Sequence, residues 1–187
     1  MYRLIFLSIF IVSGCSNSPK IAFEQLSQAA ICCQTFGHLT AVKMTARQQH
    51  NIVINNHNQV RMFDLGVSYF ELLELPQASS SVFIRSWVPQ DSVTGADLFY
   101  PVLLLLDRDL KIITTVRPIQ AWPDGFQFYL TDSILPKMYM TTTMNLPSAA
   151  RYAVVHTDYN KINATTLDLY GLPVIFSAQG QLTFWFE

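Results

Sequence analysis

The sequence is poor in the residue patterns that most enzymes and nucleic-acid-binding proteins carry. It has seven glycines among 187 residues, and neither GxGxxG nor GxxxxGK[ST] occurs, so no phosphate-cradling loop is indicated. Charged residues make up 13% of the chain, the net charge is −1, and no run of Lys and Arg indicates a nucleic-acid partner. The four histidines show no metal-ligand spacing. We therefore expect no catalytic activity, no cofactor and no metal.

What the sequence does have is apolar and aromatic character. Half of the residues are hydrophobic and 13% are aromatic, including 13 Phe and 8 Tyr. A chain of this length and composition buries a sizeable core and is typical of one folded domain.

The stretch Leu98–Pro118 predicts a β-hairpin at the centre of that domain. Val102–Leu106 is an unbroken apolar run, typical of a strand covered on both faces, and Asp107–Asp109 interrupts it with three charges. Leu110–Val116 then resumes with β-branched residues, which favour strands. A helix is the alternative because Leu has high helix propensity.

The two faces of the first hairpin strand follow from the alternation of side chains along a strand. We expect Leu103 and Leu105 to lie on one face, and Val102, Leu104 and Leu106 to lie on the other.

Shorter runs separated by turn residues predict further strands within Asn51–Val60 and at Phe70–Leu75, Ser81–Val88, Phe126–Leu130, Arg151–His156, Pro173–Ala178 and Leu182–Phe186. Ser133–Ala150 gives no clear prediction beyond methionines in the core. Before the strands, Phe23, Leu26, Ala30 and Cys33 follow the rhythm of one helical face, which predicts a helix at Ile21–Cys33. We expect a single mostly-β domain over residues 21–187, a β-sandwich of jelly-roll or immunoglobulin-like kind with one N-terminal helix.

The N-terminus predicts a lipoprotein. Arg3 precedes an apolar stretch, Leu4–Val12, that is too short to span a bilayer but fits a secretory signal. Val12-Ser13-Gly14-Cys15 resembles the bacterial lipobox, in which the cysteine is acylated and the chain is cut before it. Residues 1–14 are then the signal peptide, Cys15 the lipidation site and residues 15–20 a polar tether. Because Ser follows Cys15, we expect the outer membrane with the domain facing the periplasm; an ordinary signal peptide is the alternative.

Cys32 and Cys33 are the most unusual pair in the chain. With Cys15 acylated, two thiols remain in an oxidising compartment. They form a strained vicinal disulfide with a redox role, or disulfides between protomers, or they are two small buried thiols. The sequence leaves these alternatives open.

Aromatic side chains are the candidates for ligand binding. Trp87, Trp122 and Trp185, together with Tyr100 and Tyr129, are expected either to stack on sugar rings or to pack in the core. The other polar pairs are weaker candidates: Glu71 with Glu74 as paired carboxylates, and Asp107 with Asp109 as calcium ligands. For each pair a solvated surface or a charged hairpin tip explains the residues as well.

Several segments in order along the chain carry a resemblance to a known family. These are the lipobox, Ala29-Ala30-Ile31-Cys32-Cys33, Phe36-x-x-Leu39, FELLELP from Phe70, YPVLLLLDRDLKII from Tyr100 and RYAVVHTD from Arg151. In them the chain resembles the maltose-operon periplasmic protein family (MalM-like lipoproteins), although it lacks the Ala/Pro-rich linker and helical tail of the longer members. The resemblance implies a role beside maltodextrin uptake, and it transfers no catalytic residues.

Two functions are therefore expected. The first is a non-enzymatic accessory or structural subunit of an envelope assembly in transport or secretion, with protein partners in the cell envelope. The alternative is a carbohydrate-binding lipoprotein with maltodextrin as its ligand.

Overall fold

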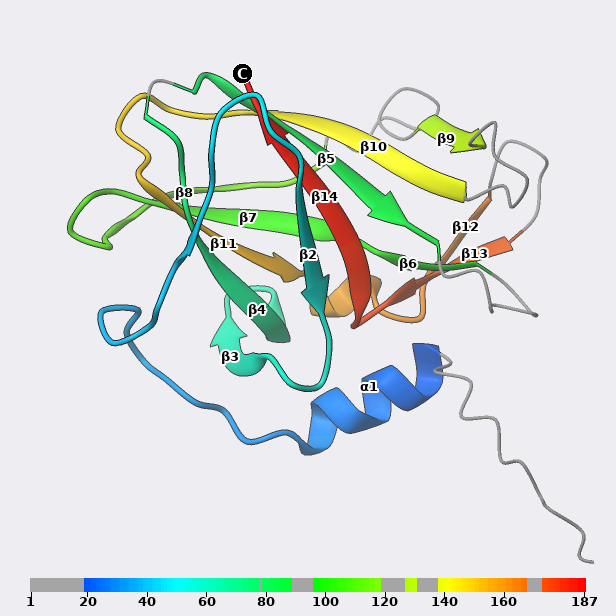
Figure 1. The fold of residues 1–187 in the computed structure, drawn as a ribbon. Coiled ribbons are helices and arrows are strands. Elements are labelled where there is room, and N and C mark those ends of the chain that lie inside the picture. The colour runs from blue at the N-terminus through cyan, green and yellow to red at the C-terminus, as the bar shows by residue number, and fades with distance from the viewer. Residues whose placement is uncertain (1–18, 78, 89–95, 119–126, 131–137, 168–172) are drawn as a thin grey trace, which may run out of the picture.

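Two β-sheets packed face to face, a small third sheet and one N-terminal helix make up the fold (Figure 1). The computed structural model describes residues 19–77, 79–88, 96–118, 127–130, 138–167 and 173–187. The predicted class, a mostly-β sandwich with one helix, is confirmed.

The six-stranded sheet contains the predicted hairpin at one edge: β7 is an interior strand and β8 ends the strand order, so the expected central position is wrong for β8. The order of this sheet is β1–β4–β11–β7–β8, and β3 pairs with β4 off this path. The bounds are β1 Val42–Lys43, β3 Gln59–Phe63, β4 Gly66–Glu74, β7 Pro101–Leu106, β8 Ile112–Val116 and β11 Tyr152–Thr157. β7 and β8 are antiparallel neighbours, which confirms the hairpin and excludes the helix alternative.

The second sheet has five strands in the order β2–β14–β5–β10–β9. The bounds are β2 His50–Ile54, β5 Ser81–Trp87, β9 Gln127–Leu130, β10 Met138–Asn145 and β14 Gly180–Phe186. A three-stranded sheet at one end joins β12 Thr165–Leu167, β13 Pro173–Ser177 and β6 Ala96–Phe99, and a 3-10 turn, Tyr159–Lys161, follows β11.

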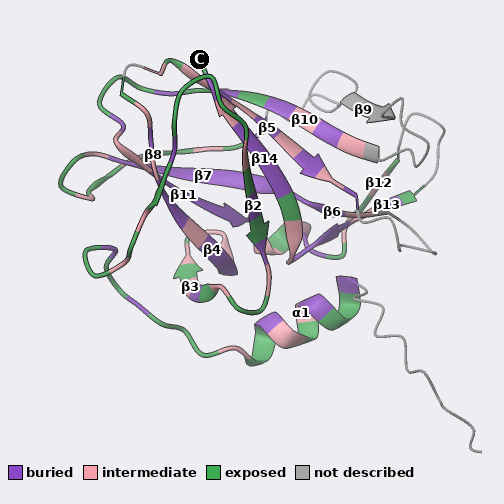
Figure 2. Ribbon diagram, viewed as in Figure 1, coloured by how far each residue is buried: buried purple, intermediate pink, exposed green. Residues whose placement is uncertain are grey.

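The core lies between the two large sheets, and the faces of β7 follow the expected alternation. Leu103 and Leu105 point into this core with Ile84 of β5 and Phe184 of β14. Leu104 and Leu106 point the other way, into a separate cluster that contains Val154. Val102, expected with them, packs instead in a third cluster with Met140 and Phe176. Figure 2 shows that β7 is buried along its whole length. A strand with no polar face is stable only when other parts of the protein cover both of its faces.

The helix is shorter than the sequence predicts. α1 spans Pro19–Gln28 and buries Pro19, Ala22 and Leu26, so the expected end at Cys33 is wrong. The chain leaves the helix because Ile31 forms a bridge with Val60 and the Cys32 N–H donates to the Val60 carbonyl at 2.8 Å. Pairing with an edge strand therefore overrides the helical spacing of the apolar residues in this segment.

Within the described ranges, no helix has the length and apolar character needed to cross a bilayer.

Five strands of the described structure are not predicted from the sequence, namely β1, β3, β6, β10 and β12. β3 follows the Asn-rich turn after β2, and β10 occupies the middle of the Ser133–Ala150 stretch. Met140 and Met144 of β10 are buried at 1% and 2% exposure, as expected of core methionines.

Substitution of Leu104 by Asp tests the placement of β7. Leu104 is 7% exposed, whereas Arg108 lies exposed in the hairpin turn. Because an unpaired buried carboxylate is costly, we expect Leu104→Asp to lower the free energy of unfolding by more than about 3 kcal/mol and Arg108→Ala to change it by less than about 0.5 kcal/mol. Denaturant unfolding of both variants measures the difference, and equal values would contradict the two-sided burial of β7.

Candidate binding face

The outer face of the five-stranded sheet carries a strip of aromatic side chains around one arginine. Along β5, Val82, Ile84 and Ser86 point into the protein, while Phe83, Arg85 and Trp87 point outward and are partly exposed. Strict alternation of the SVFIRSW segment produces this division.

Cross-strand register adds two more rings to the strip. Trp185 of β14 lies opposite Phe83, and Tyr139 of β10 lies opposite Trp87. The Phe83 and Trp185 rings stack with centroids 5.0 Å apart and planes 15° apart. The Trp87 and Tyr139 rings are also 5.0 Å apart, at 59°. Two ring pairs therefore lie along β5, separated by about 13 Å at the usual rise per strand residue.

Arg85 lies between the two ring pairs. Its Cζ is 4.2 Å from the Tyr139 centroid, 5.2 Å from that of Trp87 and 5.6 Å from that of Trp185. These are cation–π distances, so the rings hold the guanidinium in place. Its Nε is buried and has no hydrogen-bond partner among the residues described. The strip therefore contains a positively charged side chain, Arg85, with a hydrogen-bond donor that the described residues leave unpaired.

A hydrogen-bond chain beneath the strip fixes the orientation of the Trp87 indole. Trp87 Nε1 donates to Thr183 Oγ1 at 2.8 Å, and Thr183 Oγ1 donates to Asn51 Oδ1 at 2.7 Å. Thr183, which takes part in both bonds, is 2% exposed. A ring oriented in advance loses little conformational entropy when a ligand stacks on it.

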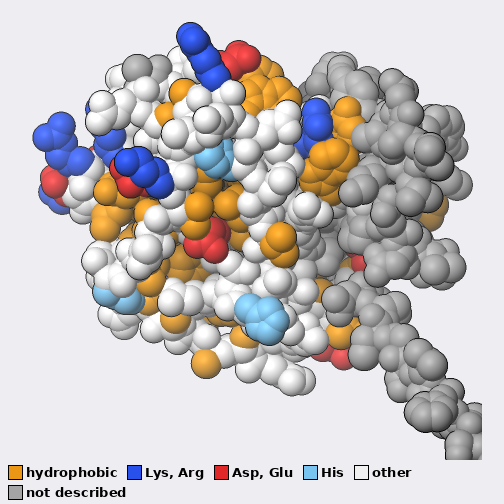
Figure 3. All heavy atoms as spheres, in the orientation of Figure 1, with side chains coloured by type: hydrophobic (Ala, Val, Ile, Leu, Met, Phe, Trp, Pro, Cys, Tyr) orange, Lys and Arg blue, Asp and Glu red, His pale blue; other side chains and the backbone are white. Residues whose placement is uncertain are grey.

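The space-filling view shows this face directly. In Figure 3 hydrophobic side chains lie on both sides of a Lys or Arg side chain over the upper strands, and grey atoms border them. Exposed aromatic rings can bind the apolar faces of sugar rings, and an arginine among them can donate to hydroxyl or carboxylate oxygens.

The structure divides the aromatic residues singled out in the sequence. Trp87 and Trp185 meet in the strip, and Trp122 lies outside the described residues. Tyr100 was expected as a stacking candidate, but it is 2% exposed and packs edge-on against Phe176, so it belongs to the core. Tyr129 lies opposite Tyr139 in the β9–β10 register, and the placement of its side chain is not described.

Sequence reasoning missed three members of the strip, namely Phe83, Arg85 and Tyr139. The alternation of β5 already places Phe83 and Arg85 on the face of Trp87. Tyr139 gives no such signal because β10 was not recognised as a strand.

Cys32 and Cys33 form a disulfide with each other, their Cα atoms 3.7 Å apart. The structure therefore has the vicinal disulfide among the alternatives, and a redox role for it stays a prediction. Cys33 packs at 8% exposure beside Phe36, and its carbonyl accepts a hydrogen bond from Arg61 at 3.1 Å. Because the disulfide links adjacent residues, its loop-entropy contribution is small, about 1 kcal/mol. It constrains local geometry more than it stabilises the fold.

The weaker carboxylate pairs do not form sites. Asp107 Oδ1 accepts from the backbone N–H groups of Asp109 and Lys111 at 2.8 and 2.9 Å, so it caps the hairpin turn. Glu71 and Glu74 lie three apart on β4 and therefore point to opposite faces. Glu71 accepts from Asn58 Nδ2 at 2.9 Å, and burial raises its pKa. In the described part of the chain, no group of three His, Cys, Asp or Glu side chains is arranged to hold a metal ion.

His156 on β11 is the most perturbed titratable group. It is 2% exposed, its ring stacks on Phe63 with centroids 4.0 Å apart, and its Nδ1 lies 3.0 Å from the Thr157 carbonyl. Burial lowers the pKa of His156 to about 4, against the opposing effects of the Thr157 carbonyl, Asp158 and Asp64, while Arg117 lowers it further.

This shift predicts a pH dependence of stability. Because the unfolded state takes up the His156 proton near pH 6.5 and the folded state only near pH 4, stability is fully present above pH 6.5 and is lost as the pH falls towards 4. Between pH 7 and pH 4.5 we expect a loss of about 2 kcal/mol from this residue. His156→Gln should remove that part of the slope in denaturant unfolding, and His57→Gln, at an exposed histidine, should keep it. An unchanged slope in His156→Gln would contradict the assignment.

The chain matches no protein-family model, no curated protein and no solved structure. The resemblance to the maltose-operon periplasmic protein family therefore rests on the sequence motifs alone.

Proposed function

We propose that the protein is a non-enzymatic accessory lipoprotein of the outer membrane that binds carbohydrate in the periplasm through its aromatic strip. The observation that carries the binding role is the strip itself, with two ring pairs flanking Arg85 on an outer sheet face. The lipobox at Cys15 supports the location, and the family resemblance supports maltodextrin as the sugar.

The geometry favours an oligosaccharide over a single sugar. The two ring pairs are separated by four residues of β5, about 13 Å, which is longer than one sugar ring. A monosaccharide contacts one pair at a time, whereas a chain of several glucose units reaches both pairs and passes over Arg85. Affinity should therefore rise with chain length.

A second function, that of an adaptor for an envelope protein, is supported by the edge of the six-stranded sheet. β8 ends the strand order of this sheet, and its Ile112 is 62% exposed. An edge strand with free backbone groups can pair with a strand of another protein.

Calorimetric titration with maltose, maltotriose and longer maltodextrins tests the carbohydrate role. We expect saturable binding that tightens with length, weakened about tenfold by Trp87→Ala or Trp185→Ala because each removes a stacking ring, about 1.4 kcal/mol. Trp87→Phe should retain most of the affinity because it keeps a ring.

Val53→Ala provides the control, since Val53 lies on the same sheet at 54% exposure but outside the strip. If no maltodextrin binds, or if the Ala variants bind as the wild type does, the strip is not a maltodextrin site. The adaptor function would then be the better supported one.

Replacement of Cys15 by Ser tests the anchor. Each buried methylene of an acyl chain contributes about 0.8 kcal/mol, so the wild type should partition wholly with membranes and take up a fatty-acid analogue. Cys15→Ser should lose the label, and the matched double variant Cys32→Ser/Cys33→Ser should keep it. Retention of label by Cys15→Ser would exclude this cysteine as the lipid site.

A further inference from the structure

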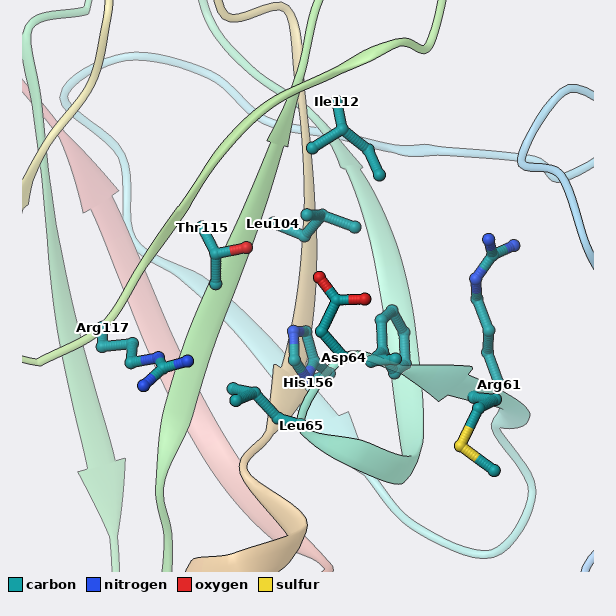
Figure 4. A pocket seen from close by; sticks show the side chains of 10 residues that line it. Arg61, Asp64, Leu65, Leu104, Ile112, Thr115, Arg117 and His156 are labelled. Atoms are coloured by element: carbon teal, nitrogen blue, oxygen red, sulfur yellow. The ribbon is translucent and has the colours of Figure 1, made fainter.

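A small cleft opens on the outer face of the six-stranded sheet, opposite the aromatic strip. It has a volume of about 100 Å³ and lies between the β3–β4 turn and β8. Leu104 of β7 and His156 of β11 line it, and Figure 4 shows His156 beside the turn residue Asp64 and Leu104 above the Asp64 carboxylate. Gly66 shapes the turn: its φ is 102°, and a Cβ there would collide with the Tyr159 side chain.

The imidazole in this cleft has an unused acceptor. Its Nδ1 lies 3.0 Å from the Thr157 carbonyl, which only accepts, so Nδ1 carries the hydrogen. In the neutral ring Nε2 is then an acceptor, and in the part of the chain that the structure describes it has no hydrogen-bond partner. A buried side chain with a free acceptor facing a cavity calls for a donor from a ligand or water.

Two opposite charges face the same cleft without pairing. In Figure 4 the Asp64 carboxylate and the Arg117 guanidinium turn inward from different sides of His156. Across the described ranges neither makes an ion pair. Arg61 also borders the cleft, but its guanidinium lies 4.2 Å from the Phe36 centroid and donates to the Cys33 carbonyl, so it is engaged elsewhere.

We propose that this cleft binds a small amino acid as its zwitterion. The ligand's ammonium group donates to His156 Nε2 and to the Asp64 carboxylate, while its carboxylate accepts from Arg117. All three contacts are charge-assisted hydrogen bonds, the stronger class. The apolar side chains of Leu65 and Leu104 line the cleft beside these charges, and its volume of about 100 Å³ suits a small ligand with a short aliphatic side chain. Glycine and alanine fit this description.

One-ended analogues separate this ligand from simpler ones. Ethylamine offers only the ammonium group of alanine, and propionate offers only its carboxylate. L-Alanine should bind the full chain, purified in detergent, at least ~10-fold more tightly than either analogue, because each lacks one charge-assisted contact. Calorimetry or ligand-observed NMR measures these affinities.

Exposed variants assign the two ends without disturbing the core. Asp64→Asn should weaken L-alanine and ethylamine at least ~10-fold and leave propionate unchanged, and Arg117→Gln should do the reverse for the two analogues. Asp109→Asn and Arg108→Gln make the same charge changes in the β7–β8 turn and should leave every affinity within ~2-fold.

Each other outcome overturns the proposal. Tighter binding of ethylamine than of L-alanine indicates an amine site, and binding of propionate or inorganic phosphate alone indicates an anion site. Absence of binding by all probes shows that the cleft holds only water. Equal effects of the turn controls and the cleft variants place the ligand elsewhere.

Discussion

The central strand pair β7–β11 is apolar on both faces, and the rest of the structure is arranged to cover it. One face meets the five-stranded sheet across the main core, where Leu103 and Leu105 lie. The other face presents Leu104, Leu106 and Val154. Exposure of these side chains to water would cost a large part of the hydrophobic free energy of folding. Residues that follow α1, with Phe36 and Cys33 among them, close over this second face. The segment that follows α1 is therefore part of the core.

The same constraint explains the cleft. Between the β3–β4 turn and β8 a cleft of about 100 Å³ remains beside the buried side chains of Leu104 and His156. β8 itself is amphipathic, with Ile113 and Val116 partly buried and Ile112 exposed. An incompletely covered apolar sheet face with one buried imidazole becomes a pocket lined by both apolar and polar groups.

The sequence predicts those parts of the fold that local patterns determine. The run Val102–Leu106 and the turn at Asp107 identify the hairpin, because an unbroken apolar run of this length is typical of a strand that is buried on both faces. β10 is not predicted because three consecutive threonines separate its methionines, so the segment shows neither the period of a strand nor that of a helix, and prolines lie on both sides of it. The predicted end of α1 is wrong for another reason. Ile31 and Cys32 pair with the free edge of β3, which lies about thirty residues further along the chain, and so do not continue the helix.

The candidate sites depend more heavily on long-range register. Trp87 is recognisable as an outward residue, yet only the β5–β14 and β5–β10 pairings bring Trp185 and Tyr139 to it. In the cleft, Asp64, Arg117 and His156 come from three separate elements, and no spacing in the sequence relates them. Local alternation thus predicts which face a residue occupies, while the sheet order decides which residues share that face.

The position of α1 has a consequence for both proposed sites. α1 packs against β13 and β4 at one end of the sandwich (Figure 1). The strip and the cleft lie on the outer faces of different sheets. Cys15 precedes Pro19 by four residues, which span at most about 14 Å when extended. With Cys15 acylated as proposed, the helical end of the sandwich is held near the bilayer and the two outer faces open sideways. Because they belong to different sheets, an oligosaccharide on the strip does not occupy the space of a ligand in the cleft.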